Sequence, residues 1–189
     1  MGVPDDITAL DNQFDAAERD ARSVAAGLSE QEGQGRTSPD SWSVAQCLAH
    51  LAIANRTYLA AMGPAAERAT AQGRERRGPA TPGVLGRWFI RSLEPPVKPR
   101  WRGKAPKVIR PQDNPTLAEA LADFLESQEQ MRAFLRRVAN LDLARISFPN
   151  PFVKWIRFSL ATGLNVIAAH ERRHIWQARQ VRATLKSER

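Results

Sequence analysis

The sequence of 189 residues is 42% hydrophobic and 25% charged, which excludes global disorder and predicts one globular domain spanning residues 1–189. No apolar run approaches the roughly 18 residues that cross a bilayer, and the N-terminus is acidic where a signal peptide is basic, so we expect a cytoplasmic protein without a membrane partner. The net charge of +8 is concentrated in residues 73–110, which hold eleven lysines and arginines but only two acidic residues.

The first predicted helix begins near Ile7. From there to Leu28, apolar residues recur every three or four positions, which is the pattern of one buried helix face. The polar residues 29–40 end it. A second helix is predicted to begin after Ser43, because Ser43 and Gln46 have the spacing of a capping box, and to stop at Gly63-Pro64.

Residues 63–115 are expected to form a long crossover. They contain nine of the thirteen prolines, with one short helix predicted around residues 84–93. The composition is that of a loop and not of a basic helix made to enter a nucleic-acid groove. Contact between residues 73–110 and nucleic acid is therefore an unfavoured alternative.

Two further helices are predicted after the crossover. The third begins at Thr116, with Glu119 in capping-box position, and runs to Val138. The fourth begins after Ser159 and runs to Leu185, and little in the sequence indicates β structure. Four helices of about 20 to 27 residues, with the crossover between the second and third, predict an all-α four-helix bundle.

The chemistry-bearing motif is "HERRH", in which His170 and His174 lie four residues apart. On a helix this spacing places both rings on one face, where they could hold one metal ion. On the second helix, His50 is flanked by the small residues Cys47 and Ala54, which would let its ring reach across the bundle. Three neutral imidazoles and a water make an open metal site. The single cysteine, Cys47, excludes a Cys-rich zinc module and is itself expected to be a small buried hydrophobic residue.

Other interpretations of the motif remain. Zinc proteases share H-E-x-x-H but need a third ligand farther along; position 180 is Gln180 and no later helix is predicted, so a protease is not expected. A polar helix face without metal, with His50 satisfied by a backbone carbonyl, is the alternative to a metal site. Glu171 is a candidate catalytic general base, but we favour a solvent-facing side chain that pairs with an arginine one turn away.

Three segments resemble the DinB-like superfamily. "SWSVAQCLAHLAIANRTYL" resembles the second helix of its members, and "HERRHIWQARQVR" resembles their last helix, with a glutamine three residues after the second histidine. "NLDLARISFPNP" before the last helix is also similar. The resemblance implies a four-helix bundle that holds a divalent metal ion, nickel or zinc, on three histidines, which map onto His50, His170 and His174.

One position departs from the family pattern. Many relatives have an acidic residue four positions before the first histidine, where this chain has Gln46. Because a metal-bound histidine usually donates its second N–H to a nearby acceptor, Gln46, Gln177 and backbone carbonyls are the candidate partners. Gln46 could equally serve only as a helix cap.

The resemblance implies two enzymatic activities, metal-dependent hydrolysis and transfer of a low-molecular-weight thiol. It also implies a small-molecule substrate and a homodimer. Arginines of the crossover near the metal could hold the carboxylates of an acidic thiol or substrate, but for any single arginine we favour a solvated position on a surface loop. A metal- or ligand-binding module without catalysis is the remaining alternative. Trp42 is expected to anchor the core, and Trp155 and Trp176 are expected to pack or to line the pocket.

Overall fold

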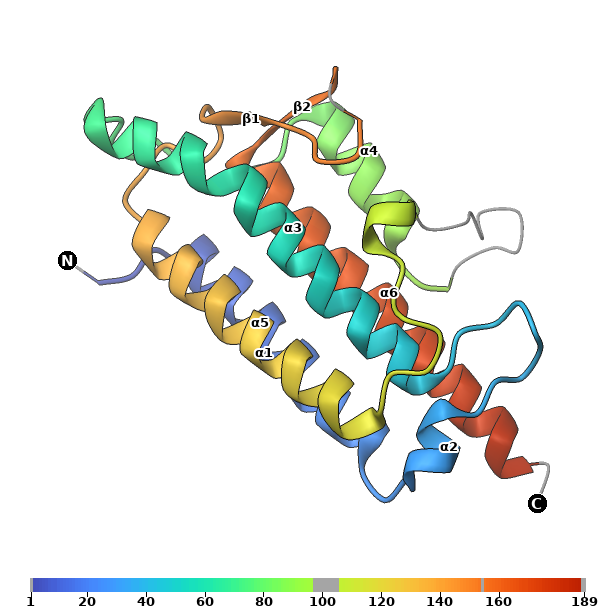
Figure 1. Cartoon of the computed structure of the whole chain (residues 1–189). Helices are drawn as coiled ribbons and strands as arrows, with labels where there is room; N and C mark the ends of the chain where they lie inside the picture. Colours follow the sequence, from blue (N-terminus) through green and yellow to red (C-terminus); the bar gives the residue numbers. More distant parts are fainter. Residues whose placement is uncertain (1, 97–105, 154, 188–189) are drawn as a thin grey trace.

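The structure is a computed structural model that describes residues 2–96, 106–153 and 155–187. Four long helices form a bundle (Figure 1): α1 (Asp5–Ala25), α3 (Val44–Ala71), α5 (Leu117–Val138) and α6 (Leu160–Ser187). The shorter elements are α2 (Glu30–Gln34), α4 (Val84–Leu93), the 3-10 turn η2 (Lys107–Ile109), and the strands β1 (Ser147–Pro149) and β2 (Arg157–Ser159). The predicted all-α four-helix bundle is confirmed. None of the described helices is long and apolar enough to cross a membrane.

Three of the four predicted helix starts agree with the structure because each of the three is capped by a side chain, whereas α1 begins after Pro4 without a side-chain cap. Ser43 accepts a hydrogen bond from the Gln46 backbone N–H, and the Gln46 side chain accepts one from the Ser43 N–H, which completes the capping box. Thr116 caps α5, and Ser159 accepts from the backbone N–H of Thr162 at the start of α6. The three caps satisfy donors that a helix cannot satisfy internally.

The predicted end of the second helix is wrong. α3 continues through Gly63-Pro64 to Ala71, although a proline inside a helix removes a hydrogen bond and costs roughly 3 kcal/mol. The compensation is tertiary packing, because the residues after the proline are buried in the core: Ala65, Ala66 and Ala69. The crossover therefore begins about eight residues later than predicted.

Several short elements were not predicted from the sequence. The polar segment after α1 contains α2, which is held by its own capping box between Ser29 and Glu32. Before α6, β1 and β2 pair antiparallel, with Phe148 opposite Phe158. Phe148 packs so closely on α6 that a Cβ atom added to Gly163 would lie 2.7 Å from its ring. The strand pair therefore covers the N-terminal end of α6.

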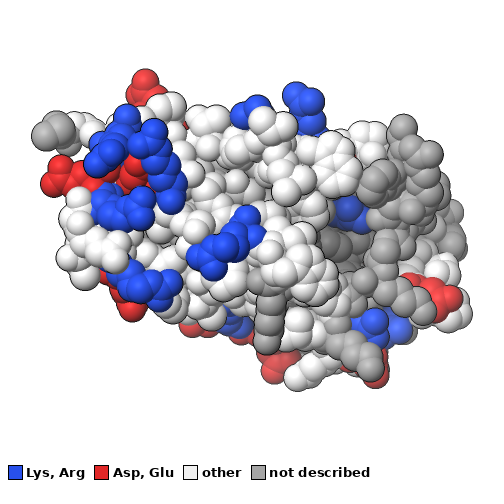
Figure 2. Space-filling view, turned by 90° about the horizontal axis from the view of Figure 1, so that it is seen from above, with Lys and Arg blue, Asp and Glu red and all other residues white. Residues whose placement is uncertain are grey.

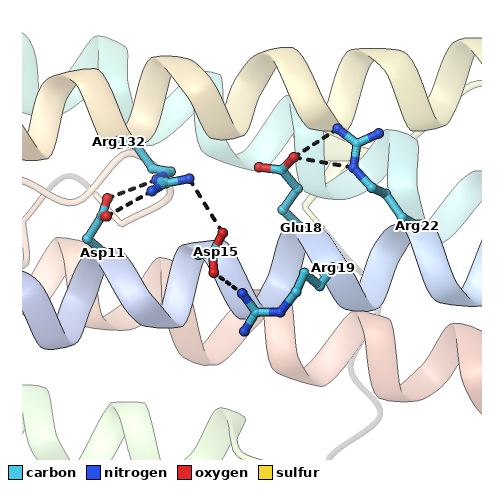
Figure 3. Close-up of polar contacts among 6 residues, drawn as sticks. All are labelled: Asp11, Asp15, Glu18, Arg19, Arg22 and Arg132. Atoms are coloured by element: carbon cyan, nitrogen blue, oxygen red, sulfur yellow. Dashed lines mark hydrogen bonds and ion pairs between the residues drawn. The ribbon is translucent and has the colours of Figure 1, made fainter.

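The bundle is held by an apolar interior and by ion pairs at its surface. The predicted stripe of α1 is buried from Ile7 to Val24. At the junction of α1 and α5, Arg132 donates two hydrogen bonds of 2.8 Å to the carboxylate of Asp11 (Figure 3). Glu18 and Arg22 pair within α1 in the same view. Partly exposed pairs of this kind contribute about 1 kcal/mol or less, so burial supplies most of the stability.

Candidate metal centre

The three histidines converge inside the bundle, although His50 lies on α3 and His170 and His174 lie on α6. Each offers a nitrogen atom, and these atoms lie within 4.8 Å of one another. The Nε2 atoms of His50 and His170 are 3.2 Å apart. Two nitrogens bound to one tetrahedral zinc ion at 2.0–2.1 Å would be separated by about 3.3 Å. The observed spacing therefore fits a shared metal ion.

Hydrogen bonds orient two of the rings towards that point. His50 Nδ1 lies 2.7 Å from the backbone oxygen of Ile109, and because a carbonyl oxygen only accepts, Nδ1 carries the proton. His174 Nδ1 donates to Oε1 of Gln177 at 3.0 Å. A proton on Nδ1 leaves the Nε2 lone pair available for a metal ion. Both rings therefore have the tautomer that ligation requires.

Burial makes all three histidines difficult to protonate. His50 is 1% exposed, and the loss of hydration lowers its pKa to about 4, although the hydrogen bond to Ile109 acts in the opposite direction. Burial also lowers the pKa of His170 and His174 well below the usual value, and the neighbouring histidines and Arg173 lower both further. The imidazoles are therefore neutral at physiological pH, the form that binds metal.

Trp42 and Arg173 flank the histidines. The Trp42 ring lies 4.6 Å from the His50 ring and 5.6 Å from the His174 ring, measured between centroids, so this expected core anchor also covers one side of the centre. Arg173 is partly buried on α6, and burial lowers its pKa. Its positive charge contributes to the lowered pKa of all three histidines.

The C-terminal part of the crossover lies next to the histidine cluster. Ile109 in η2 is the acceptor for His50. The Gln46 side chain donates to the backbone oxygens of Gln112 and Asp113, at 3.2 and 3.0 Å. Gln46 thus caps α3 and holds the crossover by hydrogen bonds. The hydrogen-bond partner of His50 is a backbone carbonyl oxygen, and not Gln46.

The expectation that Glu171 faces solvent and pairs with an arginine is wrong. Its side chain is 0% exposed, and Oε1 accepts a 2.9 Å hydrogen bond from Nδ2 of Asn55, so it neither faces solvent nor forms the expected surface pair. Burial raises its pKa to about 8, against the lowering effects of the Gln128 and Asn55 side chains. Glu171 is not a member of the histidine group, and its role as a general base stays a prediction.

Other predictions about individual residues can be compared with the structure. Cys47 is fully buried, as expected of a small hydrophobic residue, and burial raises its pKa to about 12. Trp155 is 87% exposed, so the packing predicted for it is wrong. Sequence reasoning missed Arg173 and Asn55; the position of Arg173 between the two histidines of "HERRH" was the available signal. Arg100 and Arg102 of the crossover lie outside the described residues.

The fold and the histidine cluster define a class of protein, a four-helix bundle with three histidines gathered between two helices. The sequence pattern of the DinB superfamily matches residues 13–178, and the chain belongs to the DinB superfamily. The chain is similar to a solved structure, YfiT from Bacillus subtilis, with 13% sequence identity and a TM-score of 0.57 over 95% of this chain and 87% of YfiT. YfiT is described as a probable metal-dependent hydrolase with an unusual four-helix bundle topology. No curated protein sequence matches the chain.

Proposed function

We propose that this protein binds one divalent metal ion, zinc or nickel, through His50, His170 and His174 and uses it to act on a small acidic substrate. The observation that carries the proposal is the convergence of three histidines, two buried and one half-buried, whose nitrogen atoms lie within 4.8 Å of one another. A bound ion would lower the pKa of a coordinated water or thiol towards neutrality and thereby supply a nucleophile. The superfamily membership and the likeness to YfiT support the same class of function.

The surroundings of the histidines support an acidic substrate. Arg173 places a positive charge near all three rings, and a guanidinium group binds carboxylates with two parallel hydrogen bonds. Trp42 covers the side formed by His50 and His174, whereas His170 is the partly exposed member of the cluster. Substrate would therefore approach from the side of His170.

Hydrolysis is the first candidate reaction, because YfiT is described as a probable metal-dependent hydrolase. Transfer of a low-molecular-weight thiol is the second, and the position of Glu171 favours it. The carboxyl group of Glu171 is bonded to Asn55 in the core and is not among the groups gathered around the metal position. A free thiol has a pKa of about 8.5 and needs less help from a general base than water does.

Nucleic-acid binding through residues 73–110 has less support. Arg76 pairs with Asp6 of α1 at 2.6 Å, so this arginine is used inside the fold. Figure 2 shows lysines and arginines of the described residues in separate groups with neutral surface between them. A nucleic-acid backbone is usually bound by a continuous basic surface. A steep loss of affinity for DNA or RNA with salt would revive this alternative.

The decisive experiment is elemental analysis of protein purified without a His tag. Wild type should contain close to one zinc or nickel ion per chain, and His50→Ala and His174→Ala should each lose it, while Gln180→Ala, an exposed position on α6, should keep it. A metal-free wild type that also fails to bind added zinc or nickel would refute the proposal. The metallated protein would then be tested with esters and amides for hydrolysis, and with electrophiles and thiols for thiol transfer. Activity on neither set would indicate metal binding without catalysis.

A further inference from the structure

A layer of polar side chains crosses the apolar core. On α3, Leu51 belongs to one apolar cluster and Tyr58 to another, and the polar residue between them faces polar residues of α5 and α6. All members of this polar layer are 0% exposed: Asn55, Ser127, Gln128 and Glu171. Such a layer is unusual, because burying polar groups is costly unless they are hydrogen-bonded.

Hydrogen bonds within the layer connect three helices. Nδ2 of Asn55 donates to Oε1 of Glu171 at 2.9 Å and to Oγ of Ser127 at 3.1 Å. Ser127 Oγ in turn donates to the backbone oxygen of Phe124 at 2.7 Å. Asn55 therefore ties α3 to both α5 and α6, and its bond to Glu171 joins the two helices that carry the three histidines.

The layer is not arranged for maximum stability. Four of its buried atoms have no hydrogen bond of normal geometry among the described residues: Asn55 Oδ1, Glu171 Oε2, and Nε2 and Oε1 of Gln128. The Gln128 side chain nevertheless lies close enough to Glu171 to lower its pKa. Apolar side chains of similar size would remove this penalty and extend the core. The retained polar groups therefore point to a requirement other than stability.

We propose that Glu171 is a positioning residue, whose hydrogen bond with Asn55 sets α6 against α3 so that His170 and His174 face His50. Glu171 directly follows His170, so on α6 the bond lies at the level of the histidines. Asn55 lies five residues after His50, which is about 1.4 turns along α3. The inference rests on the proposed metal centre and deepens it.

The physical reason is that apolar contacts are not directional. The buried residues of these two helices include small apolar side chains, among them Ala52 of α3 and Ala168 and Ala169 of α6. Such contacts allow α6 to rotate or slide at little cost. A buried polar pair has one favourable arrangement, and buried polar residues specify register in this way in coiled coils. A rotation of α6 by one residue, about 100°, would break the hydrogen bond between Asn55 and Glu171. The same rotation would turn His170 and His174 away from His50.

The test compares zinc affinity, by competition with a chromophoric chelator, with the melting temperature of the metal-free protein. Glu171→Leu and Asn55→Leu should each weaken zinc binding about tenfold or more, while the melting temperature stays equal or rises. Glu171→Gln keeps the acceptor oxygen and should restore affinity close to wild type. Thr162→Val removes a buried polar group from α6 at a position eight residues before His170, outside the polar layer, and should leave affinity unchanged. Wild-type affinity in Glu171→Leu, or an equal loss in Thr162→Val, would overturn the inference.

A metal-free measurement separates this inference from the proposed function. The centroids of the His50 and His170 rings are 4.9 Å apart, close enough for nuclear Overhauser contacts between their ring protons. These contacts should be present in wild type and Glu171→Gln and absent in Glu171→Leu. If wild type binds no zinc but shows this pattern, the metal centre is wrong and the positioning role stands. Contacts that persist in Glu171→Leu refute the positioning role whatever the metal does.

Discussion

Gln177 should determine how tightly His174 holds a metal ion. Its Oε1 accepts the proton of His174 Nδ1 at 3.0 Å, and His174 is only 9% exposed, so water is poorly placed to replace this acceptor. In Gln177→Leu, the metal-free ring can move its proton to Nε2 and avoid a buried, unpaired N–H. The metal-bound ring cannot, because its Nε2 atom is then occupied.

The expected loss follows from that difference. An unsatisfied buried donor costs about 1–3 kcal/mol, and here the cost falls on the metal-bound form alone. Zinc affinity should therefore fall by roughly 5- to 150-fold, which spans the roughly 10- to 100-fold effects of replacing partners of metal-bound histidines. Competition with a chromophoric chelator measures the dissociation constant, and thermal unfolding without metal should show little change.

Gln180→Leu is the matched control. Gln180 is the same residue type on the same helix, but it is exposed, so its replacement should leave zinc affinity unchanged. If Gln177→Leu binds zinc as tightly as wild type while His174→Ala loses it, the hydrogen bond has no part in the site. If both glutamine variants lose affinity equally, the effect comes from α6 as a whole and the reasoning is refuted.

Three further predictions concern stability and reactivity. In Gly63→Ala the added methyl group meets open space, so the free energy of unfolding should rise by up to about 1 kcal/mol. In Gly163→Ala it clashes with Phe148, so the free energy of unfolding should fall by roughly 1–3 kcal/mol. Urea unfolding compares the two variants, and equal effects would contradict the packing. Cys47 should not react with an aromatic disulfide reagent until the protein unfolds, because it is fully buried with a pKa raised to about 12; prompt native-state labelling would show otherwise. The hydrogen bond from Arg132 holds the pKa of Asp11 below its usual value, so its stabilisation, about 1 kcal/mol or less, is present above pH 4 and is lost as pH falls through the folded pKa. The stability difference between wild type and Asp11→Asn should therefore disappear near pH 2.

Local sequence signals determined where helices begin and how the last helix presents its histidines. Side-chain caps act within three residues, so Ser43 and Thr116 could be recognised without a tertiary structure. The spacing of His170 and His174 is likewise a property of one helix. The small neighbours of His50 indicated that its ring could reach across the bundle, and the family resemblance implied the same residue, which lies 120 residues before His170 in the sequence.

Tertiary packing decided the features that contradict local rules. Pro64 should end a helix, but the burial of the residues after it carries α3 onward to Ala71. Glu171 is a residue type usually found at the surface, but it lies in the core, where it accepts a hydrogen bond from Asn55 on another helix. The acceptor for His50 is a backbone oxygen of Ile109, which no side-chain pattern identifies. Caps and helix spacing depend on neighbours in sequence, whereas burial and ring orientation depend on residues that only the folded bundle brings together.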